Sequence, residues 1–490
     1  MNSKWLGKKL MASVRENPNI KLTDICTKAH EKWRAGVSRL KAYRARKIAI
    51  ALVDGSFKDQ YKRLYDYGHE IIRSNPYSTL KIQVQPTQQD VEDNEDGYVS
   101  RPLLPSFKRL YMCLEGCKQS FHRCRPFIGL DGCFLKGYYG GMILAAVGKD
   151  PNDQMLPIAL AVVEGETRES WTWFLELLIN DLGGQQVCKK ITFMSDQQKG
   201  LLPAMDELLP GVEQRFCVRH LHSNFKKKFP GKQLKDIMWK AARASYPQAW
   251  EKIMREIRTI NEEAHKHLMR IPPRYWSKSR FTEHSKCDSL VNNMSETFNS
   301  VILGPRGKPI VTMLEEIRNY LMERWAINRD KMSNLQPGEV LPNIKKKLEK
   351  ECELSRFWMC RVAGDKIFDV YNINQNGDKY TVNLQTMVCS CRRWMLSGIP
   401  CCHAVTSIRA RIEDPESYIP SIYRKEAYTR CYEPIIYPTY GQNQWEATNY
   451  PDILPPPIKK MPGRPKKSRN KEADEKCRDS TLVSRKGTTN

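Results

Sequence analysis

The chain has 490 residues, too many for one ordinary core, so two or three domains joined by linkers are expected. Hydrophobic residues make up 40% and aromatic residues 9%, which excludes a chain that is disordered throughout. Lysine and arginine number 80 against 55 acidic residues, a net charge of +25. This excess favours nucleic acid as partner, although a basic protein kept soluble by its charge is the alternative. No apolar run reaches the roughly 18 to 20 residues of a membrane span and no signal peptide opens the chain, so we expect a soluble, intracellular protein without a membrane partner.

The first elements in chain order are helical. From Leu6 to about Asn75, apolar residues recur at three- and four-residue spacing, as in KAYRARKIAIALVDG and QYKRLYDYGHEIIR. The acidic, Gln-rich stretch from Gln83 to Tyr98 is typical of a surface linker. We therefore predict a basic helical domain over residues 1–82, a possible DNA-binding remnant, and a linker over 83–100.

Beyond Arg101 the pattern changes to strands and turns. Three apolar runs, RPFIGLDGCF, GGMILAAVGKD and QMLPIALAVVEG, are separated by short turns and predict an antiparallel meander. ESWTWFLELLINDL is typical of an amphipathic helix, KKITFMSD of a strand ending at Asp196, and VEQRFCVRHLHSNFKKKF of a strand that runs into a basic helix. Helical blocks follow, and strand character returns between Phe357 and Tyr380. The pattern therefore predicts an α/β protein.

A cysteine-rich segment, VCSCRRWMLSGIPCCHAVTSIR, gives the strongest local signal. Cys389-x-Cys391 and Cys401-x-His403 provide three thiolates and an imidazole, a complete set for a tetrahedral structural zinc ion. Cys402 is an alternative ligand, and a disulfide or chance packing is the alternative to zinc. The segment resembles the SWIM zinc finger, whose C-x-C and C-x-H pattern favours Cys401 as the ligand. That resemblance implies a small zinc-stapled ββα finger that contacts nucleic acid or protein.

Two aspartates end apolar runs further upstream. Asp131 and Asp196 each follow a predicted strand, which places a carboxylate at the rim of a sheet. With a third acid, such a pair can hold two divalent cations about 3.5 to 4 Å apart. Hard oxygen ligands suit Mg²⁺ or Mn²⁺. Taken alone, each aspartate also fits an ordinary turn or helix cap.

The sequence around these two aspartates contains further recognisable motifs. The run from FIGLDGCF through ESWTWFLELL, with FMSDQQKGLLPAM and FCVRHLHSNF, resembles the transposase domain of Mutator-like elements. The resemblance implies a ribonuclease H-like core with a helical insertion and a DDE triad. In that triad Asp131 and Asp196 match the first two acids, and Glu296 in VNNMSETFNSVI best matches the third. Cys217-x-x-His220 matches a family signature beside the active site, where the pair would support the site by binding metal, orienting DNA or packing.

Several acids compete with Glu296 for the third position: Glu283, Asp288 and Glu315. The domain order implied by the resemblance is a helical domain (1–82), a linker (83–100), the transposase core (101–230), a helical insertion (231–290), a return helix with the third acid and a helical block (291–355), the SWIM finger (356–412), and a Pro/Tyr-rich then basic disordered tail (413–490).

Basic residues supply candidate DNA contacts. Lys226, Lys227 and Lys228 follow the Cys217-x-x-His220 signature, although a solvated helix end explains them equally well. In the tail, Gly-Arg-Pro at Arg464 is similar to an AT-hook core, which places arginine in the narrow minor groove of A·T-rich DNA. A nuclear-import signal or a plain linker is the alternative.

Together the resemblances imply a nuclear, plant-type transposase that binds terminal repeats or A·T-rich sites, self-associates and acts on no small-molecule substrate. The first alternative is a catalytically silent DNA-binding regulator with the same core, similar to the far-red-response proteins of plants. A second is a protein-interaction scaffold without salt-dependent affinity for DNA. Transposases of this kind usually carry a further zinc region near the N-terminus, and no Cys/His cluster precedes Cys113 here. Either the chain is truncated, or recognition of terminal repeats is lost or has moved to the helices before Pro76.

Overall fold

The computed structural model describes residues 2–16, 20–54, 57–86, 104–137, 139–374 and 377–457. The predicted AT-hook contact at Arg464 and residues 87–100 of the predicted linker lie outside the described residues. Within the described ranges the protein has a mixed α/β fold, with one seven-stranded and one four-stranded sheet. None of the described helices combines the length and apolar character needed to cross a membrane.

The N-terminal helices form a core of their own. Helices α1 (Ser3–Glu16), α2 (Leu22–Trp33) and α3 (Arg39–Asp54) bury small and aliphatic side chains against one another. Helices α4 (Phe57–Lys62) and α5 (Leu64–Ser74) instead pack on the main core. The next segment is strand β1 (Thr79–Gln85), because TLKIQVQ alternates apolar and polar residues. The predicted boundary between helical domain and linker, at residues 82 and 83, was therefore wrong: it falls inside a strand.

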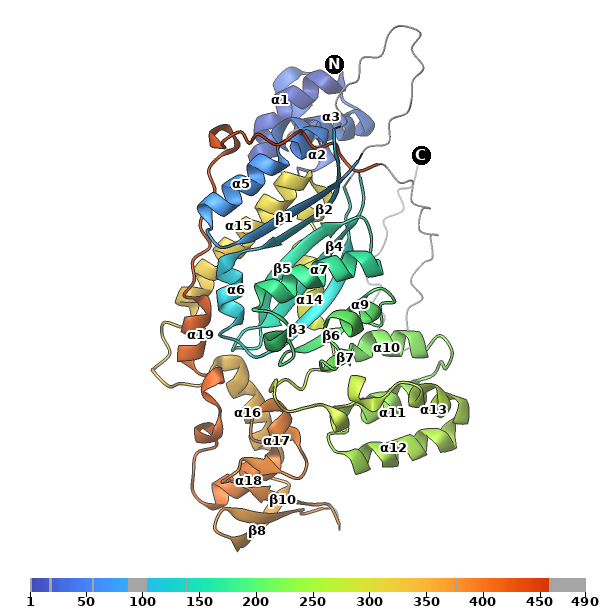
Figure 1. The fold of residues 1–490 in the computed structure, drawn as a ribbon, viewed down its shortest axis with the longest axis vertical. Helices are drawn as coiled ribbons and strands as arrows, with labels where there is room; N and C mark the ends of the chain where they lie inside the picture. The colour runs from blue at the N-terminus through green and yellow to red at the C-terminus, as the bar shows by residue number, and fades with distance from the viewer. Residues whose placement is uncertain are drawn as a thin grey trace, which may run out of the picture. The chain divides into compact units, whose positions relative to one another are not determined.

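The large sheet has the strand order β1-β2-β5-β4-β3-β6-β7. Strands β3, β4 and β5 pair antiparallel and confirm the predicted meander, whereas β6 pairs in parallel with β3 and β7 in parallel with β6. Helix α7 covers one face of this sheet and α14 the other (Figure 1). The remaining strands of the sheet are β2 (Ser106–Cys113), β3 (Phe127–Phe134), β4 (Met142–Lys149), β5 (Met155–Val163), β6 (Thr192–Ser195) and β7 (Gln214–Phe216).

Helices connect and cover these strands. The helices of the core and of the predicted insertion are α6 (Glu115–Phe121), α7 (Arg168–Asp181), α8 (Gln185–Cys188), α9 (Leu201–Leu208), α10 (Val218–Phe225), α11 (Lys232–Arg243), α12 (Pro247–Ile260) and α13 (Glu262–Met269). Helices α10 to α13 share a separate hydrophobic core, which makes the insertion a subdomain beside β7. The chain then returns to the large sheet through α14 (Asn293–Val301), continues in α15 (Ile310–Lys331), and reaches α16 (Pro342–Ser355), which packs on helix α18 (Cys402–Ala410) of the cysteine-rich region.

The small sheet belongs to the cysteine-rich region. Its strand order is β11-β10-β9-β8, and every neighbouring pair is antiparallel. The finger therefore has four strands and two short helices, more than the expected ββα unit. Its elements are β8 (Trp358–Gly364), β9 (Ile367–Asn372), β10 (Lys379–Asn383), β11 (Val388–Cys389), α17 (Arg393–Ser397) and α18 (Cys402–Ala410).

Residues 413–457, the Pro- and Tyr-rich part of the predicted tail, pack on the main core. Helix α19 (Lys425–Tyr432) buries Tyr432, whose hydroxyl donates to Asp150 at 2.8 Å. Further along, Trp445 joins the main core, and the Phe107 amide donates to the Leu454 carbonyl at 2.8 Å. Aromatic side chains, two of them on α19, thus anchor this segment. Short 3-10 turns lie at Pro273–Tyr275, Lys278–Arg280, Pro305–Gly307, Pro415–Tyr418, Ser421–Tyr423 and Gln442–Gln444.

Candidate functional site

The two predicted aspartates lie at the same level of the large sheet. In the parallel pair β3–β6, Phe127 is opposite Thr192, a separation of 65 positions. Asp131 and Asp196 have the same separation (196 − 131 = 65) and lie two positions beyond the last paired residues, Gly129 and Met194, with Asp196 immediately after the last residue of β6. Both side chains are partly buried. The two aspartates that were predicted at the ends of separate strands are therefore neighbours in the fold.

Asp131 is held in place through both carboxylate oxygens. The Gly132 amide donates to Oδ1 at 3.0 Å, and Asn299 Nδ2 on α14 donates to Oδ2 at 2.8 Å. Burial raises the pKa of Asp131 to about 7, and the neighbouring charge of Asp196 adds to that shift. Burial also raises the pKa of Asp196, against the opposing effect of His220. The two carboxylates are therefore close enough to interact electrostatically.

A glycine allows α14 to approach this strand. A Cβ on Gly129 would lie 2.2 Å from Asn292 Oδ1 and 2.7 Å from Ser295 Oγ, so only glycine fits there. Because strand side chains alternate between faces, Asp131 points to the same face as Gly129, toward α14. The Asn292 side chain also donates to the Leu130 carbonyl at 3.1 Å. The start of α14 is thereby fixed against the strand that carries Asp131.

A third acid near the pair was missed by the sequence reasoning. Glu166 follows β5, and its Oε1 lies 2.9 Å from the place where a Cβ on Gly132 would be. Burial raises its pKa, a hydrogen bond from Gln198 opposes this rise, and the charge of Asp196 reinforces it. Glu166 precedes a helix in the stretch EGETRES, where an acid is an ordinary turn residue, so no local signal distinguished it.

The Cys217-x-x-His220 signature lies between the aspartates and Glu296. Cys217 is the fully buried N-cap of α10, and His220 lies one turn later on the same helix. Contact with the Cys217 sulfur raises the pKa of His220 to about 9 against the opposing effect of burial, and Asp196 and Asp131 add to the rise. Burial alone would raise the pKa of the Cys217 thiol, but His220 and the amide of Asn292 outweigh it and lower that pKa. The two side chains are therefore electrostatically coupled.

Glu296 belongs to this second group. Its carboxylate, the Cys217 sulfur and a His220 nitrogen lie within 4.8 Å of one another. Arg219 forms an ion pair with Glu296 and donates to Asn293 Oδ1 at 2.8 Å. In the part of the chain that the structure describes, His220 thus links two sets of groups, the aspartates on one side and Glu296 on the other. The competing acids are engaged elsewhere: Glu283 pairs with Arg392, Asp288 with Lys278, and Glu315 with Arg318.

The predicted lysine cluster follows the same helix. Lys226, Lys227 and Lys228 come directly after α10 and are exposed. Lys227 Nζ donates to Asn224 Oδ1 at 3.2 Å. Their charges lie at the opposite end of α10 from Cys217 and His220.

The four predicted zinc ligands converge in the finger. Cys389, Cys391, Cys401 and His403 are all buried, with ligand atoms within 4.8 Å of one another. Cys389 Sγ lies 3.5 Å from His403 Nδ1, Cys391 Sγ lies 3.5 Å from Cys401 Sγ, and Cys401 Sγ lies 3.9 Å from His403 Nδ1. Tetrahedral zinc with Zn–S of about 2.3 Å and Zn–N of about 2.0 Å needs ligand separations of about 3.5 to 3.8 Å. The donor set therefore fits a structural zinc ion.

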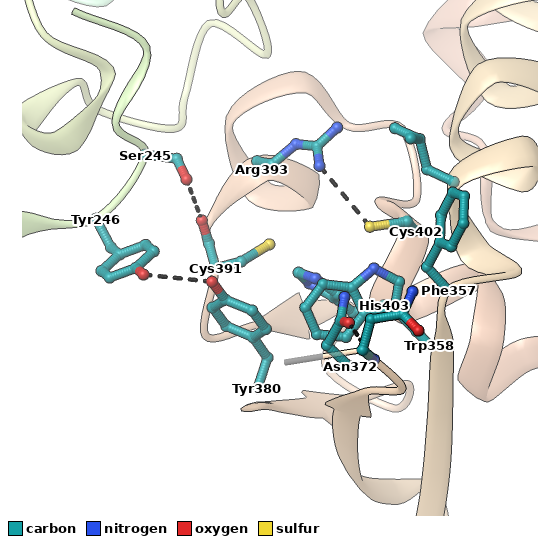
Figure 2. A pocket seen from close by; sticks show the side chains of 12 residues that line it. Ser245, Tyr246, Phe357, Trp358, Asn372, Tyr380, Cys391, Arg393, Cys402 and His403 are labelled. Carbon is teal, nitrogen blue, oxygen red and sulfur yellow. Dashed lines mark hydrogen bonds between the residues drawn. The ribbon is translucent and has the colours of Figure 1, made fainter. Parts of the chain in front are cut away.

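Cys402 is directed away from this centre. Its sulfur accepts a hydrogen bond from Arg393 at 3.8 Å, and Figure 2 shows the two side chains pointing toward each other. The Cys402 amide donates to Glu351 Oε2 at 2.9 Å, and Arg393 forms an ion pair with the same carboxylate. The expectation that Cys401 and not Cys402 belongs to the ligand set agrees with this geometry.

The histidine ligand is fixed by two aromatic rings. Tyr380 stacks on the His403 imidazole at 4.2 Å between ring centroids, and Trp358 contacts it edge-on at 4.2 Å. Burial, with a smaller contribution from Arg393, lowers the pKa of His403 to about 3. The imidazole is therefore neutral at physiological pH, as metal coordination requires.

Comparisons with known proteins agree with this geometry. A family model for the MULE transposase domain matches residues 127–224, from the start of β3 to the end of α10. A second, for the SWIM zinc finger, matches residues 380–412 and includes the four converging ligands. A search of curated proteins finds no match. The chain therefore carries a MULE transposase domain followed by a C-terminal SWIM zinc finger.

Proposed function

We propose that the protein is a Mutator-like transposase that cleaves and joins DNA strands with divalent cations held at Asp131 and Asp196. The observation that carries the proposal is the register of these two partly buried aspartates on neighbouring parallel strands. An antiparallel meander extended by two parallel strands, with acids at the ends of its central strands, also supports the ribonuclease H-like architecture implied by the family resemblance.

The residues around the aspartates suit a hard cation. Burial raises the pKa values of Asp131 and Asp196, and the charge of Asp196 adds to the rise at Asp131, so a bound Mg²⁺ or Mn²⁺ would stabilise the ionised forms of both carboxylates. Asn299 Oδ1 is buried beside Asp131 and accepts no hydrogen bond from the described residues. Such cations, when bound, polarise the phosphate and stabilise the attacking and leaving oxygens. Asp131 and Asp196 would hold them, and Asn299 keeps Asp131 oriented.

We assign the third carboxylate of the cation site to Glu296, as the family pattern implies. Glu166 is the other candidate in this fold. Glu296 is the acid of α14, which packs directly on β3. Arg219, the ion-pair partner of Glu296, is half exposed. If the Glu296 side chain rotated away from Arg219, its carboxylate would turn from Cys217 and His220 toward the aspartates. Glu166 already interacts electrostatically with Asp196.

DNA binding would use two surfaces, one at the end of α10 and one on the finger. The exposed run Lys226–Lys228 extends the signature helix and supports contacts to phosphates. Beside the zinc ligands, a cavity of about 440 Å³ is lined by Tyr246, Phe357 and Arg393 among others, which supports contacts to bases (Figure 2). We extend the proposal to terminal repeats or A·T-rich sites as targets, self-association on DNA, and a nuclear location.

Strand cleavage by the full chain tests the proposal. The substrates are a supercoiled plasmid and labelled duplexes that carry the sequences flanking the protein's own gene, with Mg²⁺ or Mn²⁺ added. Wild type should nick the DNA, and Asp131→Asn and Asp196→Asn should abolish nicking. Asp206→Asn, which removes an exposed acid of α9, is the matched control. Glu296→Gln and Glu166→Gln compare the two candidates for the third carboxylate. Nicking that survives in the Asp131 and Asp196 variants would refute the proposal.

One observation favours a second function. The ion pair between Arg219 and Glu296 directs the third acid away from the aspartates, as in a core that no longer cleaves. The same core and finger would then act as a DNA-binding regulator that does not cleave. That function predicts DNA binding that is unchanged by neutralising the three acids, together with no metal-dependent nicking by wild type.

A further inference from the structure

A second group of metal-binding side chains lies beside the aspartates. In the described part of the chain, Cys217, His220 and Glu296 bring one sulfur, one imidazole nitrogen and one carboxylate oxygen within 4.8 Å of one another. They come from two helices, because Cys217 and His220 are at the start of α10 and Glu296 is in the first turn of α14. The group is separate from the four ligands of the finger.

The cysteine is fixed by the backbone around it. Its amide donates to the Ser195 carbonyl at 2.7 Å, which ties the start of α10 to the end of β6. The next amide, of Val218, donates to the Leu290 carbonyl at 2.8 Å. The Cys217 sulfur is fully buried and accepts a hydrogen bond from the Asn292 amide at 3.4 Å. The sulfur is thus presented from a rigid position toward the segment that leads into α14.

The histidine has an unused nitrogen. His220 Nδ1 is buried and has no hydrogen-bond partner among the residues that the structure describes. A buried imidazole nitrogen without a partner loses its hydrogen bond to water and gains nothing in return, unless a ligand reaches it. The Cys217 sulfur lies beside the imidazole and raises its pKa, but none of the described residues forms a hydrogen bond at Nδ1. This unsatisfied nitrogen is evidence for a ligand that is independent of the grouping itself.

The chemistry of the donors selects the ion. Thiolate, imidazole and carboxylate together match zinc, whereas Mg²⁺ prefers oxygen ligands alone. We propose that Cys217, His220 and Glu296 bind a second zinc ion, with a fourth position open to solvent or to a neighbouring carboxylate. Arg219, which now pairs with Glu296, is half exposed and has room to move into solvent. The ion would clamp the start of α10 to the start of α14.

This inference does not rest on the proposed nuclease function, although the two share Glu296. A Glu296 carboxylate that binds zinc cannot at the same time serve the aspartate pair, so the zinc site and the assignment of Glu296 as third carboxylate describe alternative positions of one side chain, and Glu166 is the other candidate acid. A zinc count and a cleavage assay therefore give separate answers. Two zinc ions in an inactive protein would support the inference alone, and one zinc ion in an active nuclease would support the nuclease alone.

Metal analysis of the untagged full chain tests the inference. The protein is loaded with zinc, dialysed against metal-free buffer, and its zinc measured by mass spectrometry per mole of chain. We expect about two equivalents in wild type, one after Cys217→Ser, and two in the control Cys402→Ser, whose sulfur lies outside both sets. His220→Asn is a second variant, with circular dichroism to check folding. One equivalent in folded wild type, or two equivalents that persist in Cys217→Ser, would overturn the inference.

Discussion

Neutralising Asp131 should stabilise the metal-free protein at neutral pH. The Asp131 carboxyl has its pKa raised from 3.8 to about 7 by burial and by Asp196. The folded state therefore holds a proton more tightly than the unfolded chain does. Its contribution to stability is complete below about pH 4 and is lost as pH rises to about 7.

The size of this loss of stability follows from the shift in the pKa of Asp131. A pKa of about 7 in place of 3.8 corresponds to on the order of 4 kcal/mol at pH 8. Because Asp131 is only partly buried, solvent screening should reduce this to about 1 to 2 kcal/mol. Asp131→Asn removes the charge but keeps an oxygen that accepts from Asn299. The variant should thus be more stable than wild type at pH 8 and equal to it near pH 4.

Urea unfolding between pH 4 and pH 8, in buffer freed of divalent cations by resin so that the finger keeps its zinc, measures this difference. Added Mn²⁺ should stabilise wild type and leave Asp131→Asn unchanged, since only wild type offers the carboxylate pair. Asp206→Asn, at an exposed position, should show neither effect. An Asp131→Asn variant that is less stable than wild type at pH 8 would refute the reasoning about carboxylate crowding.

Three further predictions concern the finger, the sheet and the basic surface. Cys401→Ser should lose the finger's zinc and expose residues 380–412 to proteolysis, whereas Cys402→Ser should keep both the zinc and the protection. Gly129→Ala should destabilise the core by about 1 to 3 kcal/mol in urea unfolding, because its Cβ would lie 2.2 Å from an oxygen of the residue before α14. Gly165→Ala, with no atom within 4 Å, is the control and should leave stability nearly unchanged. Replacing the lysines of Lys226–Lys228 by glutamine should lower the slope of log affinity for duplex DNA against log salt by up to about 3. An unchanged slope would exclude these lysines from the DNA interface.

Local patterns were sufficient for the parts of the site that depend on strands and spacing. The meander was predictable because its apolar runs and turns are contiguous, and Asp131 and Asp196 meet because their separation equals the strand register. The zinc ligands were predictable because two short pairs within one segment define the donor set.

The parts of the site and fold that could not be predicted depend on packing between segments that are distant in the sequence. Glu166 reaches the aspartates from a turn that carries no distinguishing pattern, and Glu296 is directed to Cys217 and His220 by how α14 approaches α10. Likewise, residues 413–457 are ordered because Tyr432 and Trp445 pack in the main core, which the Pro- and Tyr-rich composition of the segment does not reveal. Burial of that kind depends on tertiary partners and not on periodicity.

The most direct test of the central claim is titration of the zinc-loaded full chain with Mn²⁺, followed by electron paramagnetic resonance of the free ion. If Asp131 and Asp196 share divalent cations, wild type should take up Mn²⁺, and the double variant Asp131→Asn, Asp196→Asn should take up none at the same concentrations. Equal uptake by the two proteins would contradict a cation site at this pair of strands.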